Sequence, residues 1–138
     1  MTAVVLDASC ALTWCFEDEA RPSTDELFRR VQAEGAVVPP LWHLEVGNIL
    51  LAAERRRRLS QADVEAYLAL LQRLRLDTDA APAERGRADI LHLAREHALT
   101  VYDAAYLDLA MRRRLPLATL DAGLQRAAGA AGVDLIEL

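Results

Sequence analysis

The feature that most constrains the fold is a repeated alternation of short apolar runs with longer stretches of helical periodicity. The apolar runs are 3–6 (AVVL), 35–40 (GAVVPP), 115–120 (LPLATL) and 133–138 (VDLIEL). Runs of this length and β-branched composition are typical of buried strands. Strands that alternate with helical crossovers form parallel sheets covered by helices. The alternation therefore predicts an α/β fold with a mostly parallel sheet.

Helical patterns fill the segments between these runs. The stretch 25–35 ends on a glycine, which suits the residue after a helix C-terminus. Residues 41–58 are long enough for four or five turns, and 59–74 begins with Ser60 and Asp63 in a capping-box arrangement. We expect these two helices to form a hairpin. The remaining expected elements are a short helix at 9–15, an extended segment at 74–78, a helix over 82–97, a helix opened by Asp103 and a helix running into a loop at 126–132.

The length of 138 residues fits one domain, so we expect 1–138 to fold around one core. The sequence starts without the basic segment and long apolar core of a signal peptide, and no apolar run approaches the ~20 residues that span a bilayer. These features predict a cytoplasmic protein with no membrane partner. Cys10 and Cys15 belong to no metal or redox motif, so we expect both to be reduced core residues.

The basic residues are unusual because all 16 are arginine. A chain without lysine cannot carry the Gly-Lys-[Ser/Thr] of a phosphate-binding P-loop, and it offers no lysine for Schiff-base catalysis. The formal net charge is −5. The molecule as a whole therefore does not attract nucleic acid as a strongly basic domain would.

Carboxylates recur where the expected strands end. Asp7 directly follows the first strand, and Asp121 follows the third apolar run in the same relation. Ligands of open parallel sheets bind at this edge. Glu45 lies one turn into the helix after the second strand, and Asp103 opens the helix before the strand of Asp121. Any single aspartate here could instead cap a helix, but the joint occurrence favours convergence of all four acids on one site.

Glu45 is the hardest of these acids to explain as a structural residue. Its apolar neighbours predict a helix that is buried on most sides, where an acid needs a partner. Four carboxylates in one place repel each other, and a cation would neutralise them. All the donors are oxygen atoms, which favours Mg²⁺ or Mn²⁺ over zinc or copper. Such ions hold substrate phosphates, so the pattern indicates phosphodiester or phosphoryl chemistry.

Four segments in order carry a family resemblance: VVLDAS (4–9), PPLWHLEVGNIL (39–50), VYDAAYLDLA (101–110) and LATLD (117–121). Together they resemble PIN-domain ribonucleases, specifically the VapC-type toxins of bacterial toxin–antitoxin pairs, over essentially the whole chain. The resemblance implies a three-layer α/β/α domain with a central, mostly parallel sheet of four or five strands. It implies catalytic, metal-binding roles for Asp7, Glu45, Asp103 and Asp121, and supporting polar roles for Ser9, Asn48 and Thr119.

The resemblance also implies an activity and partners. Mg²⁺ or Mn²⁺ would activate a water that hydrolyses an RNA phosphodiester bond. A VapB-like antitoxin would lay a segment across the groove and place an Arg or Lys among the acids. The apolar hairpin at 41–74 would serve either a homodimer or that antitoxin. The arginine clusters at 54–58 and 111–114 either stabilise helix ends or guide RNA phosphates toward the acids.

Two other readings compete with this one. Receiver and haloacid-dehalogenase-like domains also place aspartates at strand ends, but both expect an active-site lysine, and the latter expect Asp-x-Asp where this chain has Asp7-Ala8-Ser9. A catalytically inactive PIN-like module that binds RNA or protein is the non-enzymatic alternative. The presence of all four acids favours an enzyme.

Overall fold

The structure is a computed structural model, and it describes residues 2–138. Its centre is a four-stranded sheet in the order β3-β2-β1-β4, in which every ladder is parallel. The strands are β1 (Val4–Leu6), β2 (Ala36–Val38), β3 (Leu76–Thr78) and β4 (Leu117–Ala118). The predicted parallel sheet, including the extended segment at 74–78, is confirmed.

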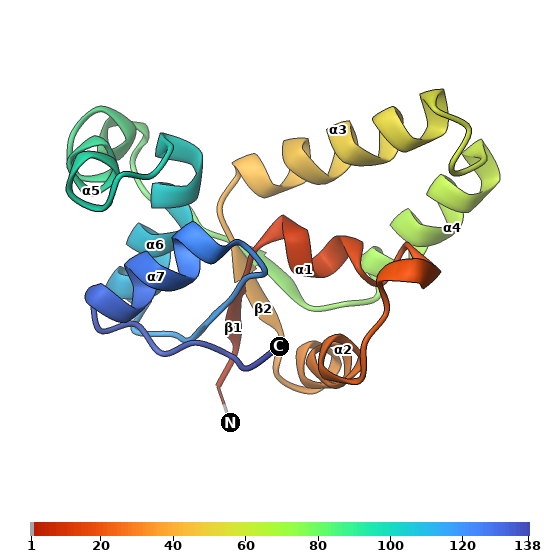
Figure 1. Cartoon of the computed structure of the whole chain (residues 1–138), viewed down its shortest axis with the longest axis horizontal. Helices are drawn as coiled ribbons and strands as arrows, with labels where there is room; N and C mark the ends of the chain where they lie inside the picture. The colour runs from red at the N-terminus through yellow and green to blue at the C-terminus, as the bar shows by residue number, and fades with distance from the viewer. Residues whose placement is uncertain (1) are drawn as a thin grey trace.

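Seven α-helices and two 3-10 helices occur within residues 2–138. Figure 1 shows α1 to α4 on one side of the strands and α5 to α7 on the other, which confirms the three-layer α/β/α arrangement. The helices are α1 (Ala8–Leu12), η1 (Glu17–Glu19), α2 (Pro22–Glu34), α3 (Leu41–Arg55), α4 (Gln61–Gln72), η2 (Ala83–Arg87), α5 (Asp89–His97), α6 (Val101–Arg113) and α7 (Ala122–Ala130).

Local sequence signals set several helix ends. Helix α2 begins earlier than predicted because Pro22 occupies its first turn, where a missing N–H costs nothing. It ends at Gly35, whose φ is +84° and where an added Cβ would lie 3.1 Å from the Arg75 carbonyl oxygen. The predicted capping box of α4 is present, with the Ser60 hydroxyl accepting from the Asp63 backbone N–H. Helices α3 and α4 form the expected hairpin (Figure 1).

Two predicted elements are wrong. The helix expected over 82–97 is divided into η2 and α5, because Ala88 adopts a non-helical backbone (φ −123°, ψ −98°). The strand expected over 133–138 is reduced to one bridge between Leu117 and Leu135. Strand β4 spans only two residues, so the C-terminal segment finds few partners along it.

The core lies on both faces of the sheet and is mainly apolar, although a few polar side chains, including three aspartates, are also buried. Cys10 is buried and Cys15 is half-buried, and both are free thiols. Burial raises the pKa of the Cys10 thiol to about 12, so it stays protonated as a core residue. No helix within residues 2–138 is both long and apolar enough to cross a membrane. The largest fully buried side chains are Trp42, Tyr106, Leu6, Leu27, Leu50, Leu107, Leu109, Leu117 and Leu124.

Candidate metal centre

The C-terminal ends of β1 and β4 bring Asp7 and Asp121 to the same edge of the sheet. The two strands are neighbours, and Leu6 lies opposite Ala118. Asp7 precedes α1 but makes no side-chain capping bond to it, so the helix does not require this carboxylate. Asp121 does cap a helix, since its Oδ2 accepts from the Leu124 backbone N–H at 2.8 Å in α7. Of these two acids, only Asp121 caps a helix through its side chain.

Two hydroxyl groups fix the Asp7 carboxylate. The Thr119 Oγ1 donates to Asp7 Oδ2 at 2.6 Å, and the Ser9 Oγ donates to the same oxygen at 2.9 Å. The backbone N–H of Leu120 donates to Ser9 Oγ at 3.2 Å, which orients that hydroxyl. The structure thus places Ser9 and Thr119 against Asp7. Asn48 lies on an exposed part of α3 and makes no side-chain hydrogen bond within residues 2–138.

Glu45 reaches the same edge from α3. Its Oε1 accepts a hydrogen bond of 2.5 Å from the hydroxyl of Tyr106, a fully buried residue of α6. The prediction that this helix is buried on most sides is wrong, because Leu44 is 77 % exposed and Ile49 and Leu51 are also exposed. Only one side of α3 packs on the core, and Glu45 lies at the border of that side, half-buried.

Asp103 lies in the first turn of α6 and does not open the helix as predicted. The helix begins at Val101 and is capped by Thr100, whose Oγ1 accepts from the Asp103 backbone N–H at 3.1 Å. Thr100 is therefore the N-cap residue, and the Asp103 carboxylate is not needed to cap the helix. The negative charge of Asp103 still benefits from the positive end of the helix dipole.

Electrostatic repulsion links each of the four acids to at least one of the others. Burial raises the pKa of Asp7 more than the hydrogen bonds from Thr119 and Ser9 lower it, and the charge of Asp121 makes the smallest of these contributions. Burial also raises the pKa of Asp103, with further contributions from Asp121 and Asp7. The pKa of Glu45 is raised by burial and then by Asp7 and Asp103, although the Tyr106 hydroxyl opposes the shift. The edge of the sheet is therefore a region of unfavourable negative charge that a cation would relieve.

The carboxylates do not form a closed cage. Among residues 2–138, no three His, Cys, Asp or Glu side chains stand close enough together to hold an ion as they are oriented. The donor set fits a hydrated Mg²⁺ or Mn²⁺ all the same, because Mg²⁺ typically keeps several waters and takes only one or two carboxylates directly. The two hydroxyl donors hold Asp7 as the fixed oxygen donor around which such an ion would bind.

A second group of buried aspartates, which are paired with arginines, was not predicted from the sequence. Asp108 accepts from Arg85 at 2.5 Å and from Arg112 at 2.8 Å, and Arg112 and Arg113 also hold Asp79. Burial alone would raise the pKa of Asp79, but hydrogen bonds from the two arginines outweigh it and leave the pKa below its usual value. Asp79 directly follows β3, as Asp7 follows β1, but its negative charge is balanced by Arg112 and Arg113. The Asp108–Arg112 spacing of i, i+4 was the available signal.

In the described part of the chain, each of the two arginine clusters contains arginines that form ion pairs and arginines that do not. Arg112 and Arg113 are committed to the aspartates described above, and Arg58 pairs with Asp18 at 2.8 Å while lying over the Phe16 ring. The other members of the two clusters, Arg55, Arg56, Arg57 and Arg114, are exposed and make no ion pair within residues 2–138. The prediction that arginines contact RNA stays a prediction, and it is confined to these four residues.

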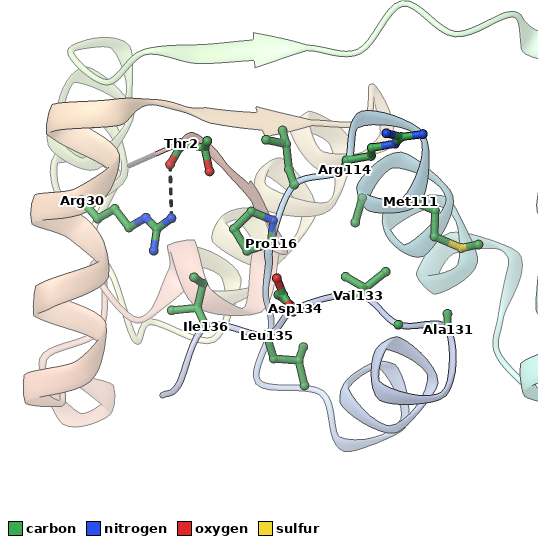
Figure 2. Close-up of a pocket in the computed structure, with 13 residues that line it drawn as sticks. Thr2, Arg30, Met111, Arg114, Pro116, Ala131, Val133, Asp134, Leu135 and Ile136 are labelled. Carbon is green, nitrogen blue, oxygen red and sulfur yellow. Dashed lines mark hydrogen bonds between the residues drawn. The ribbon is translucent and has the colours of Figure 1, made fainter.

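A cavity of about 660 Å³ lies at the opposite edge of the sheet, where β4 begins (Figure 2). Its lining is mixed, with Thr2, Arg30 and Arg114 beside apolar side chains, and Asp134 is its one carboxylate among the described residues. Arg30 lies at one side of it, with a guanidinium N–H donated to the Thr2 carbonyl at 3.2 Å. None of the four acids lines this cavity, so it is separate from the candidate metal centre.

Comparison with known proteins identifies the family to which the chain belongs. The family model of the PIN domain matches residues 4–130, and the chain therefore belongs to the PIN domain family. PIN domains are generally nucleases and typically use divalent metal ions. No curated protein matches the sequence.

Several solved structures share the fold. PAE2754 from Pyrobaculum aerophilum is 21% identical, with a TM-score of 0.74 over 98% of this chain and 90% of that chain. FitAcB from Neisseria gonorrhoeae is 16% identical, with a TM-score of 0.57 over 97% of this chain and 96% of that one. The expected PIN-like architecture is confirmed.

Proposed function

We propose that this protein is a metal-dependent endoribonuclease and the toxin of a VapBC-type toxin–antitoxin system, folded as a single PIN-like domain over 1–138 and located in the cytoplasm. The observation that carries the proposal is Asp7. It is a buried carboxylate, held by two hydroxyls at the ligand-binding edge of a parallel sheet, and it senses the charge of Asp121. A buried carboxylate without a cationic partner is costly to the fold, and the hydrogen bonds to Asp7 leave its pKa above the ordinary value, which supports a role in binding a cation.

In the proposed mechanism, the acidic residues bind the metal and two hydroxyl groups orient one of them. Asp7, Glu45, Asp103 and Asp121 would hold the cation. When bound, Mg²⁺ or Mn²⁺ supplies a water of lowered pKa for in-line attack on the phosphodiester and stabilises the charge on the leaving oxygen. The hydroxyls of Ser9 and Thr119 keep the Asp7 carboxylate in one orientation. No side-chain nucleophile is needed.

The proposed partners are RNA, a VapB-like antitoxin and a second copy of the chain. The hairpin of α3 and α4 supports a protein partner, because Leu44, Ile49, Leu51 and Leu68 expose apolar surface there. In the proposal, the antitoxin places a basic side chain among the acids. Such a side chain would relieve the same repulsion that the metal relieves.

The alternative of an inactive PIN-like binding module has one observation in its favour. Within residues 2–138 the acids do not stand close enough to clamp an ion in their present orientations. A module of this kind would bind RNA or protein without cleaving it. It would also gain nothing from added metal.

The two functions separate in a cleavage assay. Purified protein is incubated with end-labelled RNA and Mn²⁺ or Mg²⁺, then with excess EDTA, and finally with the metal restored. We expect cleavage with metal, loss of cleavage in EDTA and recovery on restoring the ion, because the water is activated only by the bound cation. RNA binding without cleavage at any metal concentration supports the inactive module. Cleavage that persists in EDTA contradicts the metal-dependent mechanism.

A further inference from the structure

The hydroxyl of Tyr106 links two helices that lie in different layers. Tyr106 belongs to α6 and Glu45 to α3, and a hydrogen bond joins their side chains. Burial raises the pKa of both groups, and the charge of nearby Asp7 contributes to the rise. Tyr106 is completely buried, with its ring fixed in the core between neighbours that are also buried. Its hydroxyl is therefore a donor in a fixed position.

Glu45 needs such a donor more than Asp7 or Asp121 does. The carboxylate of Asp7 is short and already held by two hydroxyls, and Asp121 is held by its own helix N-terminus. Glu45 has a longer side chain on a half-exposed helix face, and its carboxylate makes no other side-chain hydrogen bond within residues 2–138. Without Tyr106 the glutamate would sample several rotamers, and binding an ion would have to restrict them.

We propose that Tyr106 is the positioning residue for Glu45: its hydroxyl donates to Oε1 and restrains the carboxylate, so that Oε2 would remain available to a divalent cation. The inference rests on the proposed function, since it assumes that Glu45 is a metal ligand. Groups that hydrogen-bond to a ligand typically change metal affinity by about 10- to 100-fold. Tyr106 touches neither RNA nor metal in this account.

The chain offers a matched control in Tyr67. This tyrosine of α4 is also buried, and its hydroxyl donates to the backbone carbonyl of Ala11. Tyr67→Phe and Tyr106→Phe each remove one buried hydroxyl and keep the ring. The two variants should therefore lose similar stability, and only Tyr106→Phe should change metal binding.

The test is calorimetric titration of RNA-free protein with Mn²⁺ for wild type, Tyr106→Phe, Tyr67→Phe, Glu45→Gln and the double variant Glu45→Gln/Tyr106→Phe. We expect Tyr106→Phe to bind Mn²⁺ about 10-fold or more weakly and Tyr67→Phe to bind as wild type does. The double variant should bind no more weakly than Glu45→Gln, because Tyr106 acts through Glu45. Thermal melting of both phenylalanine variants verifies that they are folded.

Three results would overturn the inference. Unchanged Mn²⁺ affinity in Tyr106→Phe, or equal weakening in Tyr67→Phe, would show that the hydroxyl has no specific effect on the site. Additive losses in the double variant would show that Tyr106 does not act through Glu45. Absence of Mn²⁺ binding by wild type is a different failure, because it removes the proposed metal-dependent function itself.

Discussion

Asp7→Asn is expected to reduce RNA cleavage by at least about 100-fold while leaving the fold as stable as wild type or more stable. The loss of activity follows from removing the fixed negative oxygen donor of the proposed metal site. The gain in stability follows from burial, since Asp7 is 6 % exposed and its pKa is raised chiefly by desolvation. Asparagine keeps an oxygen that can accept from the hydroxyls of Ser9 and Thr119.

The sign of this stability effect depends on pH. A carboxyl group whose pKa is raised in the folded protein contributes stability below its unfolded value of 3.8, and that contribution is lost as the pH rises through the folded pKa. At neutral pH the ionised Asp7 therefore works against folding, and the neutral amide does not. Below the unfolded pKa both side chains are neutral and the two proteins should be similarly stable.

The measurement combines cleavage rates in Mn²⁺ with thermal melting in EDTA, at neutral and at acidic pH. Asp25→Asn is the control, because Asp25 is an exposed residue of α2 and its loss changes the net charge equally. Full activity of Asp7→Asn would remove Asp7 from the mechanism. A melting temperature of Asp7→Asn well below that of wild type at neutral pH would show that the ionised Asp7 does not destabilise the folded protein.

Asp108→Ala is expected to destabilise the protein by about 3 kcal/mol, near the lower end of the range for breaking a buried ion pair. The Asp108 side chain is 4 % exposed and accepts from both Arg85 and Arg112, which would lose this partner. The two guanidiniums retain 26% and 28% exposure, so water compensates in part. For a chain of this length the change corresponds to a melting temperature lower by roughly 10 °C.

Asp77→Ala is the matched control for this experiment. Asp77 also pairs with an arginine, at 3.2 Å from Arg113, but its side chain is 64% exposed. Exposed pairs contribute less than about 1 kcal/mol, so its loss should barely change the midpoint of chemical denaturation. Equal destabilisation by the two variants would show that the buried network of Asp108 has no special part in holding α6, the helix that carries Asp103.

The comparison of sequence with structure shows which features a sequence pattern can predict. Periodicity was sufficient for the strands before Asp7 and Asp121, because a buried parallel strand reads as a short continuous apolar run. The rule that ligands bind beyond the strand ends then selected the acids at those ends. The Ser60–Asp63 capping box could be predicted because all its atoms come from one turn of helix.

Other features depend on contacts between distant segments and could not be predicted in this way. The bond from Tyr106 to Glu45 joins residues 61 positions apart, and the bond from Arg112 to Asp79 joins residues 33 apart. The start of α6 was wrongly predicted for a different reason. Thr100 is a local N-cap signal that the sequence contains, but the helix was expected to begin at Asp103. The C-terminal run 133–138 has the composition of a strand but only a two-residue strand beside it.

The most direct test of the central claim is anomalous diffraction from crystals soaked in Mn²⁺. We expect an anomalous peak at the edge where β1 and β4 end, with oxygen atoms of Asp7 and of at least one other of the acids Glu45, Asp103 and Asp121 bound to the ion. A soaked crystal that shows no Mn²⁺ at this edge, or an ion held only by other residues, would rule out a metal site built on Asp7.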